Sequence, residues 1–83
     1  MRLHIKLFAI LRQRASAPEV TLELPEGTTV AAMLAQLQTQ HPGLLTDAPS
    51  IMVAVNMEYV GHDHAVRNGD EIALIPPVSG GDL

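Results

Sequence analysis

Cysteine is absent from the 83 residues of this chain. No disulfide can therefore strengthen the fold, and no thiol is available for redox or nucleophilic chemistry. Zinc sites built on thiolates and iron–sulfur clusters are excluded for the same reason. A chain this short forms one small domain that buries about 60% of the surface its unfolded form exposes, so we expect a thin margin of stability.

Basic residues are also scarce, because five Lys and Arg stand against nine Asp and Glu, for a net charge of −4. Nucleic-acid-binding proteins present a basic face, so we expect no nucleic-acid partner. The longest apolar runs, such as residues 7–11, are far shorter than the ~20 residues that span a bilayer, and the N-terminal segment does not resemble a signal peptide. The composition predicts a globular, cytoplasmic protein with no membrane partner.

Residues 3–7 and 20–24 alternate apolar and polar side chains with the period of a half-buried strand, and residues 51–55 and 72–75 place Ile, Val or Leu at every second position, so all four segments are expected to be strands. Residues 59–60 form a short further strand after a turn at Asn56.

A short helical turn is expected over residues 9–15. The main helix has apolar residues at helical spacing between Val30 and Leu37; Thr28 or Thr29 is predicted to cap it, and Pro42 to end it.

The element order is strand, strand, helix, strand, strand, strand, which predicts an α+β roll. The commonest compact fold with this order is the β-grasp, or ubiquitin-like, roll: a mixed sheet of about five strands with one main helix on one face. We expect this domain to cover residues 1–78, and residues 79–83 to form a flexible C-terminal Gly-Gly tail with two extra residues.

No group of residues in the sequence looks like a catalytic site of this chain alone. The His-Asp-His run at 62–64 is the one cluster of potential metal ligands, but no third ligand with supporting partners is obvious nearby, so an exposed polar loop is favoured and no metal is expected. No serine lies in a nucleophile elbow, and no glycine-rich loop joins a strand to a helix.

Three apolar residues fall where polar ones are expected: Phe8 and Ile75 on the polar faces of their strands, and Tyr59 on a short outer strand. If the first and last strands are neighbours, Phe8 and Ile75 form one exposed patch, which usually indicates a protein partner. The alternative is a second small core beneath the loops.

The C-terminal segment 76–81, Pro-Pro-Val-Ser-Gly-Gly, has no bulky side chain near its end. Such a segment can enter a narrow channel of another protein, because glycine lets a backbone approach closely. The alternative is an ordinary frayed terminus.

Taken together, three motifs resemble the MoaD family, the small ubiquitin-like sulfur carriers of molybdopterin synthase, which are related to the thiamine sulfur carrier ThiS. The motifs are Leu-Phe-Ala at 7–9 with Arg12, Val-Ala-Val-Asn at 53–56, and the Gly-Asp-Glu strand from residue 69 that runs into Pro-Pro-Val-Ser-Gly-Gly. The resemblance covers essentially the whole chain.

The resemblance implies a carrier subunit and co-substrate whose catalytic residues lie on the large, MoaE-like subunit. Gly81 would be adenylated with ATP by an E1-like, MoeB-like enzyme and converted to a thiocarboxylate that supplies sulfur for the dithiolene of molybdopterin. Gly80 would pass through the partner's channel, and no cofactor would be bound permanently. The expected partner-binding residues are Phe8, Tyr59, Ile75, Pro76, Pro77, Val78 and Ser79.

The sequence departs from the family's working form, which ends at the second glycine, because Asp82 and Leu83 follow Gly81. We favour removal of both residues by a processing protease. A fragment of a fused protein and a paralogue with another role are the alternatives.

Rival functions are a sulfur carrier for cysteine, thiamine or a tungsten pterin, a ubiquitin-like protein modifier joined through Gly81, and an interaction module whose tail is inert.

Overall fold

The computed structural model describes residues 1–46 and 50–76. They contain five strands and two helices, and their bounds are β1 (Arg2–Leu7), α1 (Ile10–Ala15), β2 (Glu19–Glu23), α2 (Val30–Gln40), β3 (Met52–Val55), β4 (Glu58–Val60) and β5 (Glu71–Ile75). This order is the one predicted from the alternation of apolar residues, and the element limits differ by only a few residues.

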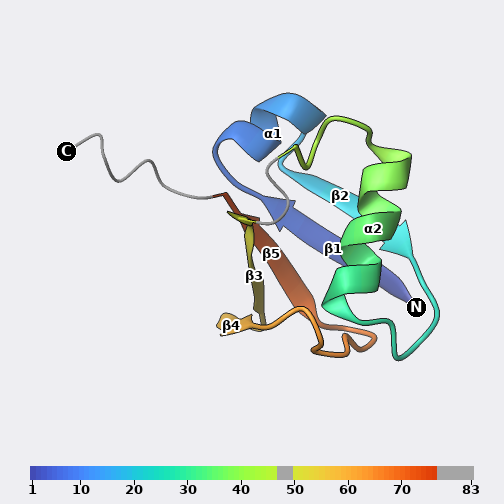
Figure 1. Cartoon of the computed structure of the whole chain (residues 1–83). Coiled ribbons are helices and arrows are strands. Elements are labelled where there is room, and N and C mark those ends of the chain that lie inside the picture. The colour runs from blue at the N-terminus through green and yellow to red at the C-terminus, as the bar shows by residue number, and fades with distance from the viewer. Residues whose placement is uncertain (47–49, 77–83) are drawn as a thin grey trace.

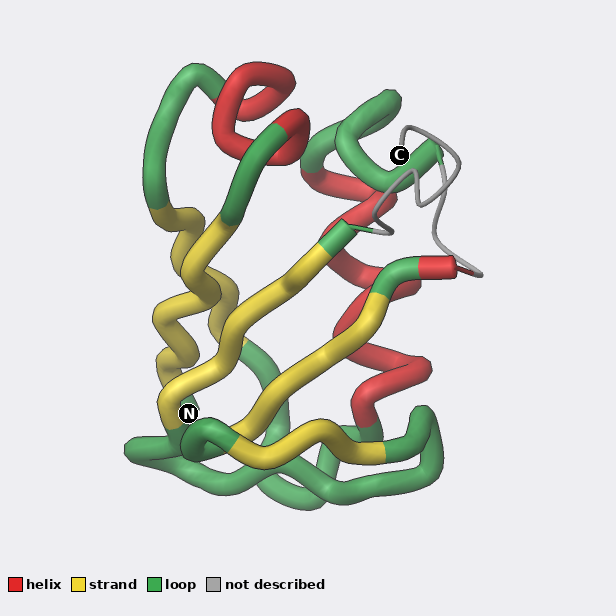
Figure 2. The backbone as a smooth tube through the Cα atoms, turned by 90° about the vertical axis from the view of Figure 1, so that its left-hand side faces the viewer, coloured by secondary structure: helices red, strands yellow, loops and turns green. Residues whose placement is uncertain are grey.

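The strands form one mixed sheet in the order β2-β1-β5-β3-β4, and α2 crosses one face of it (Figure 1). The last strand of the described residues, β5, lies at the centre, parallel to β1 and antiparallel to β3. Viewed at right angles to the first direction, the strands and α2 form two separate layers (Figure 2). The predicted β-grasp roll, with one main helix on one face of a five-stranded sheet, is confirmed.

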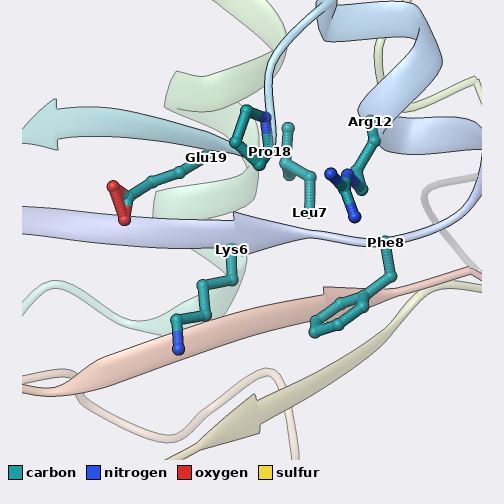
Figure 3. Close-up of a pocket in the computed structure, with 6 residues that line it drawn as sticks. All are labelled: Lys6, Leu7, Phe8, Arg12, Pro18 and Glu19. Carbon is teal, nitrogen blue, oxygen red and sulfur yellow. The ribbon is translucent and has the colours of Figure 1, made fainter.

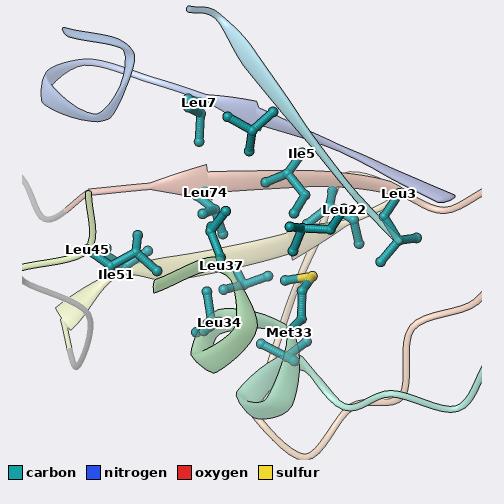
Figure 4. Close-up of a cluster of buried hydrophobic side chains, with 14 of the residues drawn as sticks. Leu3, Ile5, Leu7, Leu22, Met33, Leu34, Leu37, Leu45, Ile51 and Leu74 are labelled. Atoms are coloured by element: carbon teal, nitrogen blue, oxygen red, sulfur yellow. The ribbon is translucent and has the colours of Figure 1, made fainter. Parts of the chain in front are cut away.

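The hydrophobic core lies between α2 and the inner face of the sheet (Figure 4). Strands contribute every second residue, so that β1 buries its residues 3, 5 and 7 and exposes those between them. The helix contributes one stripe of buried residues, which are Val30, Met33, Leu34 and Leu37. Burial of these apolar side chains is the main force that holds the helix on the sheet.

The ends of α2 follow the predicted signals. Thr29 is the residue that caps the helix, because its hydroxyl accepts a hydrogen bond from the Ala32 N–H at 3.2 Å. The loop that precedes β5 also holds this end, since the carbonyls of His62 and His64 accept the N–H groups of Ala31 and Val30 at 2.9 Å. This contact gives the His-Asp-His run a structural role through its backbone.

Neither helix in the described part of the chain is long and apolar enough to cross a membrane. The predicted boundary between residues 78 and 79, and the tail that follows it, lie outside the described residues.

Candidate docking face

The face of the sheet opposite α2 has an apolar region at one end. In the register of the strands, Ile75 of β5 pairs with Met52 of β3. Leu7 of β1 pairs with Leu74 of β5, so Phe8, one residue beyond β1, lies next to Ile75. Phe8 and Met52 are 43% and 47% exposed, whereas Ile75 is half-buried between them. The predicted neighbourhood of Phe8 and Ile75 is therefore confirmed.

Tyr59 extends this region across the sheet. It pairs with Ala54 of β3, which pairs with Ala73 of β5, and its side chain is 63% exposed. Met57, in the turn between β3 and β4, is 89% exposed, more than any other large hydrophobic residue in the described part of the chain. The five side chains on this face are called the outer patch below: Phe8, Met52, Met57, Tyr59 and Ile75.

Small side chains make a hollow in the outer patch. Ala54 and Ala73 lie next to each other in the sheet, and around them a depression of about 210 Å³ is also lined by Lys6, Phe8, Met57 and Glu71. The larger neighbours form its rim because alanine leaves room above the strands. A hollow with an aromatic ring and a methionine at its edge suits the insertion of an apolar side chain from another protein.

Two residues at this face have strained backbone conformations. Ala9, which ends the β1 segment after Phe8, has φ 52° and ψ −128°, and Met57 has φ 71°. Positive φ is unfavourable for residues with a Cβ, so glycine is the residue expected at such turns. Asn56, at φ 53°, tolerates the conformation and also accepts the Glu71 N–H through its side-chain oxygen at 3.0 Å.

The charged groups of this face form ion pairs across strands. Lys6 Nζ lies 2.6 Å from Glu71 Oε2, and Arg2 Nη2 lies 2.7 Å from Glu23 Oε2. The hydrogen bond and the negative charge of Glu71 raise the pKa of Lys6, and the hydrogen bond and positive charge of Arg2 lower the pKa of Glu23. Each pair is solvent-exposed, so each adds little to stability.

A second hollow adjoins the outer patch where β1 meets α1. Figure 3 shows Lys6 and the ring of Phe8 on the same side of β1, with Arg12 of α1 above them. Its other lining residues are Leu7, Pro18 and Glu19. The Arg12 side chain makes no hydrogen bond or ion pair within the described residues, so it is available to a partner's acidic group.

Of the predicted site residues, the structure brings Phe8, Tyr59 and Ile75 onto one face, and Pro76 follows directly where β5 leaves the sheet, half-buried. Because β1 and β5 are parallel, Phe8 and Pro76 lie at the same end of the sheet. The other predicted residues, Pro77, Val78, Ser79, Gly80 and Gly81, lie outside the described residues.

Met52 and Met57 are the members of the outer patch that the sequence did not single out. The outward position of Met52 follows from its place between Ile51 and Val53, both of which are buried. The outward position of Met57 could be found only from the geometry of the turn. In residues 1–46 and 50–76, no group of three or more His, Asp or Glu side chains is placed to hold a metal ion.

The strand order, the crossing helix and the central C-terminal strand define the ubiquitin-like β-grasp class of proteins. The model of the ThiS family matches residues 5–81, and the chain belongs to that family. Similar to it is the molybdopterin synthase sulfur carrier subunit of Chlamydomonas reinhardtii, which is 39% identical over 83 residues, or 98% of this chain and 100% of the relative.

Solved structures agree with this assignment. The crystal structure of SAMP1 from Haloferax volcanii matches with a TM-score of 0.86 and 34% identity, over 98% of this chain and 100% of that chain. The complex of subunits 1 and 2 of molybdopterin-converting factor from Helicobacter pylori 26695 contains a chain that matches with a TM-score of 0.70 over 98% of this chain and 100% of that chain. At 22% identity, this second likeness shows the fold alone.

Proposed function

We propose that this chain is the sulfur carrier subunit of a molybdopterin synthase, and that its reactive group is the carboxyl of Gly81. The observation that carries the proposal is the position of β5: the central strand ends at Ile75 beside Phe8, so the segment that follows starts from the outer patch. A partner that binds this face therefore lies beside Pro76, the residue from which the C-terminal segment continues. The relatives' sulfur carrier role supports the same conclusion.

The chemistry requires activation before sulfur can enter. A carboxylate is ionised at neutral pH and is a poor electrophile. Adenylation with ATP by an E1-like enzyme converts it to a mixed anhydride with AMP as leaving group, and sulfur then replaces oxygen to give a thiocarboxylate. The chain binds no cofactor permanently in this scheme, and we expect the reaction to take place in the cytoplasm, where ATP is available. The sulfur nucleophile is the thiocarboxylate itself, which fits a chain that has no cysteine.

The partner that uses the sulfur is a large, MoaE-like subunit that supplies the catalytic residues. Its expected contacts are the outer patch, Pro76 and the segment of residues 77–79. The exposed apolar side chains of the patch favour an interface core that excludes water, and the Lys6–Glu71 ion pair at the edge of its hollow favours a defined orientation. The E1-like enzyme is expected to bind the same end of the sheet, because it must reach the same carboxyl.

Processing is part of the proposal, since the Gly81 carboxyl exists only after the peptide bond to Asp82 is cleaved. The family match supports this position, because it ends at residue 81. A narrow channel that accepts glycine would exclude the side chains of Asp82 and Leu83.

The test compares a chain that ends at Gly81 with one that ends at Leu83, each incubated with ATP and the E1-like enzyme. Release of pyrophosphate is expected with the first chain and not with the second. A third chain that ends at Gly81 and carries Gly80→Val is the control for channel fit, and it should be activated poorly. Equal pyrophosphate release from the first two chains would refute processing at Gly81.

A ubiquitin-like modifier is the second candidate, and the match to SAMP1, a small archaeal modifier protein, favours considering it. The same activated glycine would then form amide bonds with lysines of other proteins. Antibody detection in cell extract separates the two: a modifier gives a ladder of high-mass conjugates that disappears when Gly81 is deleted, whereas a dedicated carrier gives no ladder.

A further inference from the structure

Methionine is the only sulfur-containing residue of this chain, because the sequence has no cysteine. The four methionines are Met1, Met33, Met52 and Met57. A thioether reacts with a peroxide to give a sulfoxide, which turns an apolar side chain into a polar one. A mild peroxide therefore acts on this chain first at one of these four residues, and their exposure decides at which one.

The structure ranks the methionines by their access to water. Met57 is 89% exposed and Met52 is 47% exposed, whereas Met33 lies in the core and is 0% exposed. Met1 is half-buried against the core. Peroxide reaches a thioether from solvent, so it meets Met57 most readily, and Met33 is shielded until the chain unfolds.

Met57 also occupies a backbone position that favours a different residue. Asn56 and Met57 form the two-residue turn between β3 and β4, since Val55 pairs with Glu58. Both turn residues have positive φ, 53° for Asn56 and 71° for Met57. Turns of this kind favour asparagine followed by glycine, because glycine has no Cβ to clash. Met57 thus combines an unfavourable backbone conformation with an exposed apolar side chain, and a residue that breaks two local rules points to a role for that side chain.

Hydrogen bonds hold the turn in place. The Asn56 N–H donates to the Glu71 carbonyl at 2.8 Å, and the Asn56 side-chain oxygen accepts the Glu71 N–H at 3.0 Å. The Asn56 side-chain amide also donates to the Asp70 carboxylate at 3.0 Å. These contacts fix the turn to the start of β5, so the Met57 side chain stays at the surface of the sheet.

Met57 lines the hollow of about 210 Å³ above Ala54 and Ala73. A partner that fills this hollow therefore contacts the thioether, whose flexible and polarisable side chain packs well against apolar groups. Oxidation would place a polar S=O group in the same contact. Burial of a polar group that lacks a hydrogen-bond partner is unfavourable, so the oxidised chain should dock less tightly.

We propose that Met57 is the oxidation site of the outer patch, and that its conversion to the sulfoxide by a peroxide keeps the carrier from docking on its partner. The effect on docking rests on the proposed function, whereas the oxidation itself does not. Methionine sulfoxide reductases return the sulfoxide to the thioether, so the change is reversible.

The oxidant in this reaction is hydrogen peroxide. A lone pair of the Met57 sulfur attacks one peroxide oxygen, forming an S–O bond while the O–O bond breaks. The sulfur is oxidised by two electrons, and the peroxide is reduced. The departing hydroxide takes the proton of the transferred oxygen and becomes water, so the chain gains the mass of one oxygen atom.

The first test needs no partner and does not depend on the proposed function. The folded chain is treated with dilute hydrogen peroxide, and the rate of oxygen gain at each methionine is located by tandem mass spectrometry of its peptides. Met57 should be oxidised about twofold or more faster than Met52, in line with their exposed fractions of 89% and 47%. Met33 should react last.

The same treatment in concentrated urea is the control, because the rates should converge once the fold is lost. Equal rates at Met52 and Met57 in the folded chain, or a rate at Met33 that matches the rate at Met57, would overturn the assignment of Met57 as the oxidation site.

The second test measures docking with the chain that ends at Gly81 and keeps its carboxylate, so that methionine supplies its only sulfur. Isothermal titration calorimetry with the large subunit gives the dissociation constant before and after peroxide. The constant should rise about tenfold on oxidation and return to its first value after a methionine sulfoxide reductase and dithiothreitol are added. An increase of less than twofold would overturn the effect on docking.

Two variants assign the change to one residue, and each is compared with itself before and after peroxide. Met57→Leu keeps an apolar side chain that peroxide does not oxidise, so its dissociation constant should change less than twofold on treatment. Met52→Leu should still show the roughly tenfold increase. The opposite pattern would place the sensitive thioether at Met52 and overturn the proposal.

Bound partner supplies a further measurement, since an excess of the large subunit should slow the oxidation of Met57 in the unaltered chain. An equal rate with and without the partner would show that docking leaves Met57 uncovered and would overturn the effect on docking. If the untreated chain did not bind the large subunit at all, the proposed function would be refuted together with the effect on docking, whereas the ranking of oxidation rates would stand.

Discussion

Replacement of Phe8 by alanine separates docking from folding. The ring lies on the outer patch and is 43% exposed, and a phenylalanine has about 200 Å² of surface to bury. A partner that covers the exposed part therefore removes about 85 Å² of apolar surface from water. At about 25 cal/mol per Å², this burial contributes about 2 kcal/mol to binding, which corresponds to a roughly 30-fold change in the dissociation constant.

The assay is isothermal titration calorimetry of the carrier into the large subunit. Phe8→Ala should weaken binding about 30-fold, and far-ultraviolet circular dichroism should show the unaltered fold, since Phe8 is outside the buried core. Gln36→Ala is the control, because Gln36 is exposed on α2, a helix on the other face of the sheet. If Phe8→Ala bound within twofold of the unaltered chain, the outer patch would not be the docking face.

Three further changes test other parts of the account. Met57→Gly should raise the free energy of unfolding in urea by about 0.5–1 kcal/mol, because glycine relieves the positive φ. The same variant should weaken binding to the large subunit in the calorimetric assay. Unchanged binding would show that Met57 is not part of the docking interface. Thr29→Ala should lower the free energy of unfolding by about 1 kcal/mol through loss of the cap on the Ala32 N–H, and no loss would show that the cap is dispensable. Arg2 lowers the pKa of Glu23 in the folded chain, so the stabilisation by this pair is present above the carboxyl's unfolded pKa and disappears as pH falls through the folded value. Glu23→Gln should therefore differ from the unaltered chain in its free energy of unfolding in urea at pH 7 but not in strong acid. An equal difference at both pH values would refute the pair's contribution.

Much of the fold could be predicted from local patterns. In a sheet with one buried face, every second residue of a strand points into the core, so apolar residues recur with a period of two. The alternation in β1 fixed which side chains face α2, and the same rule placed Phe8 and Ile75 on the opposite face. The cap at Thr29 and the positive φ of Asn56 follow from side-chain chemistry that is equally local.

Features that depend on register could not be predicted in this way. The ion pair between Lys6 and Glu71 joins residues that are 65 positions apart, and only the parallel pairing of β1 with β5 brings them together. The hollow above Ala54 and Ala73 likewise arises from two small residues that meet across strands. Neither Ala54 nor Ala73 shows anything in the sequence that predicts the hollow.

The turn residue Met57 is a different case, because its local signal was misleading. A tight turn between two strands favours glycine after asparagine, and methionine has no such preference. Its positive φ of 71° and its exposure therefore became visible only in the structure.

The most direct test of the account is the intact mass of the protein isolated from its own cells. The account predicts a species that has lost Asp82 and Leu83 and in which one oxygen at the new Gly81 terminus has been replaced by sulfur. A population in which every molecule retains Asp82 and Leu83 would contradict it.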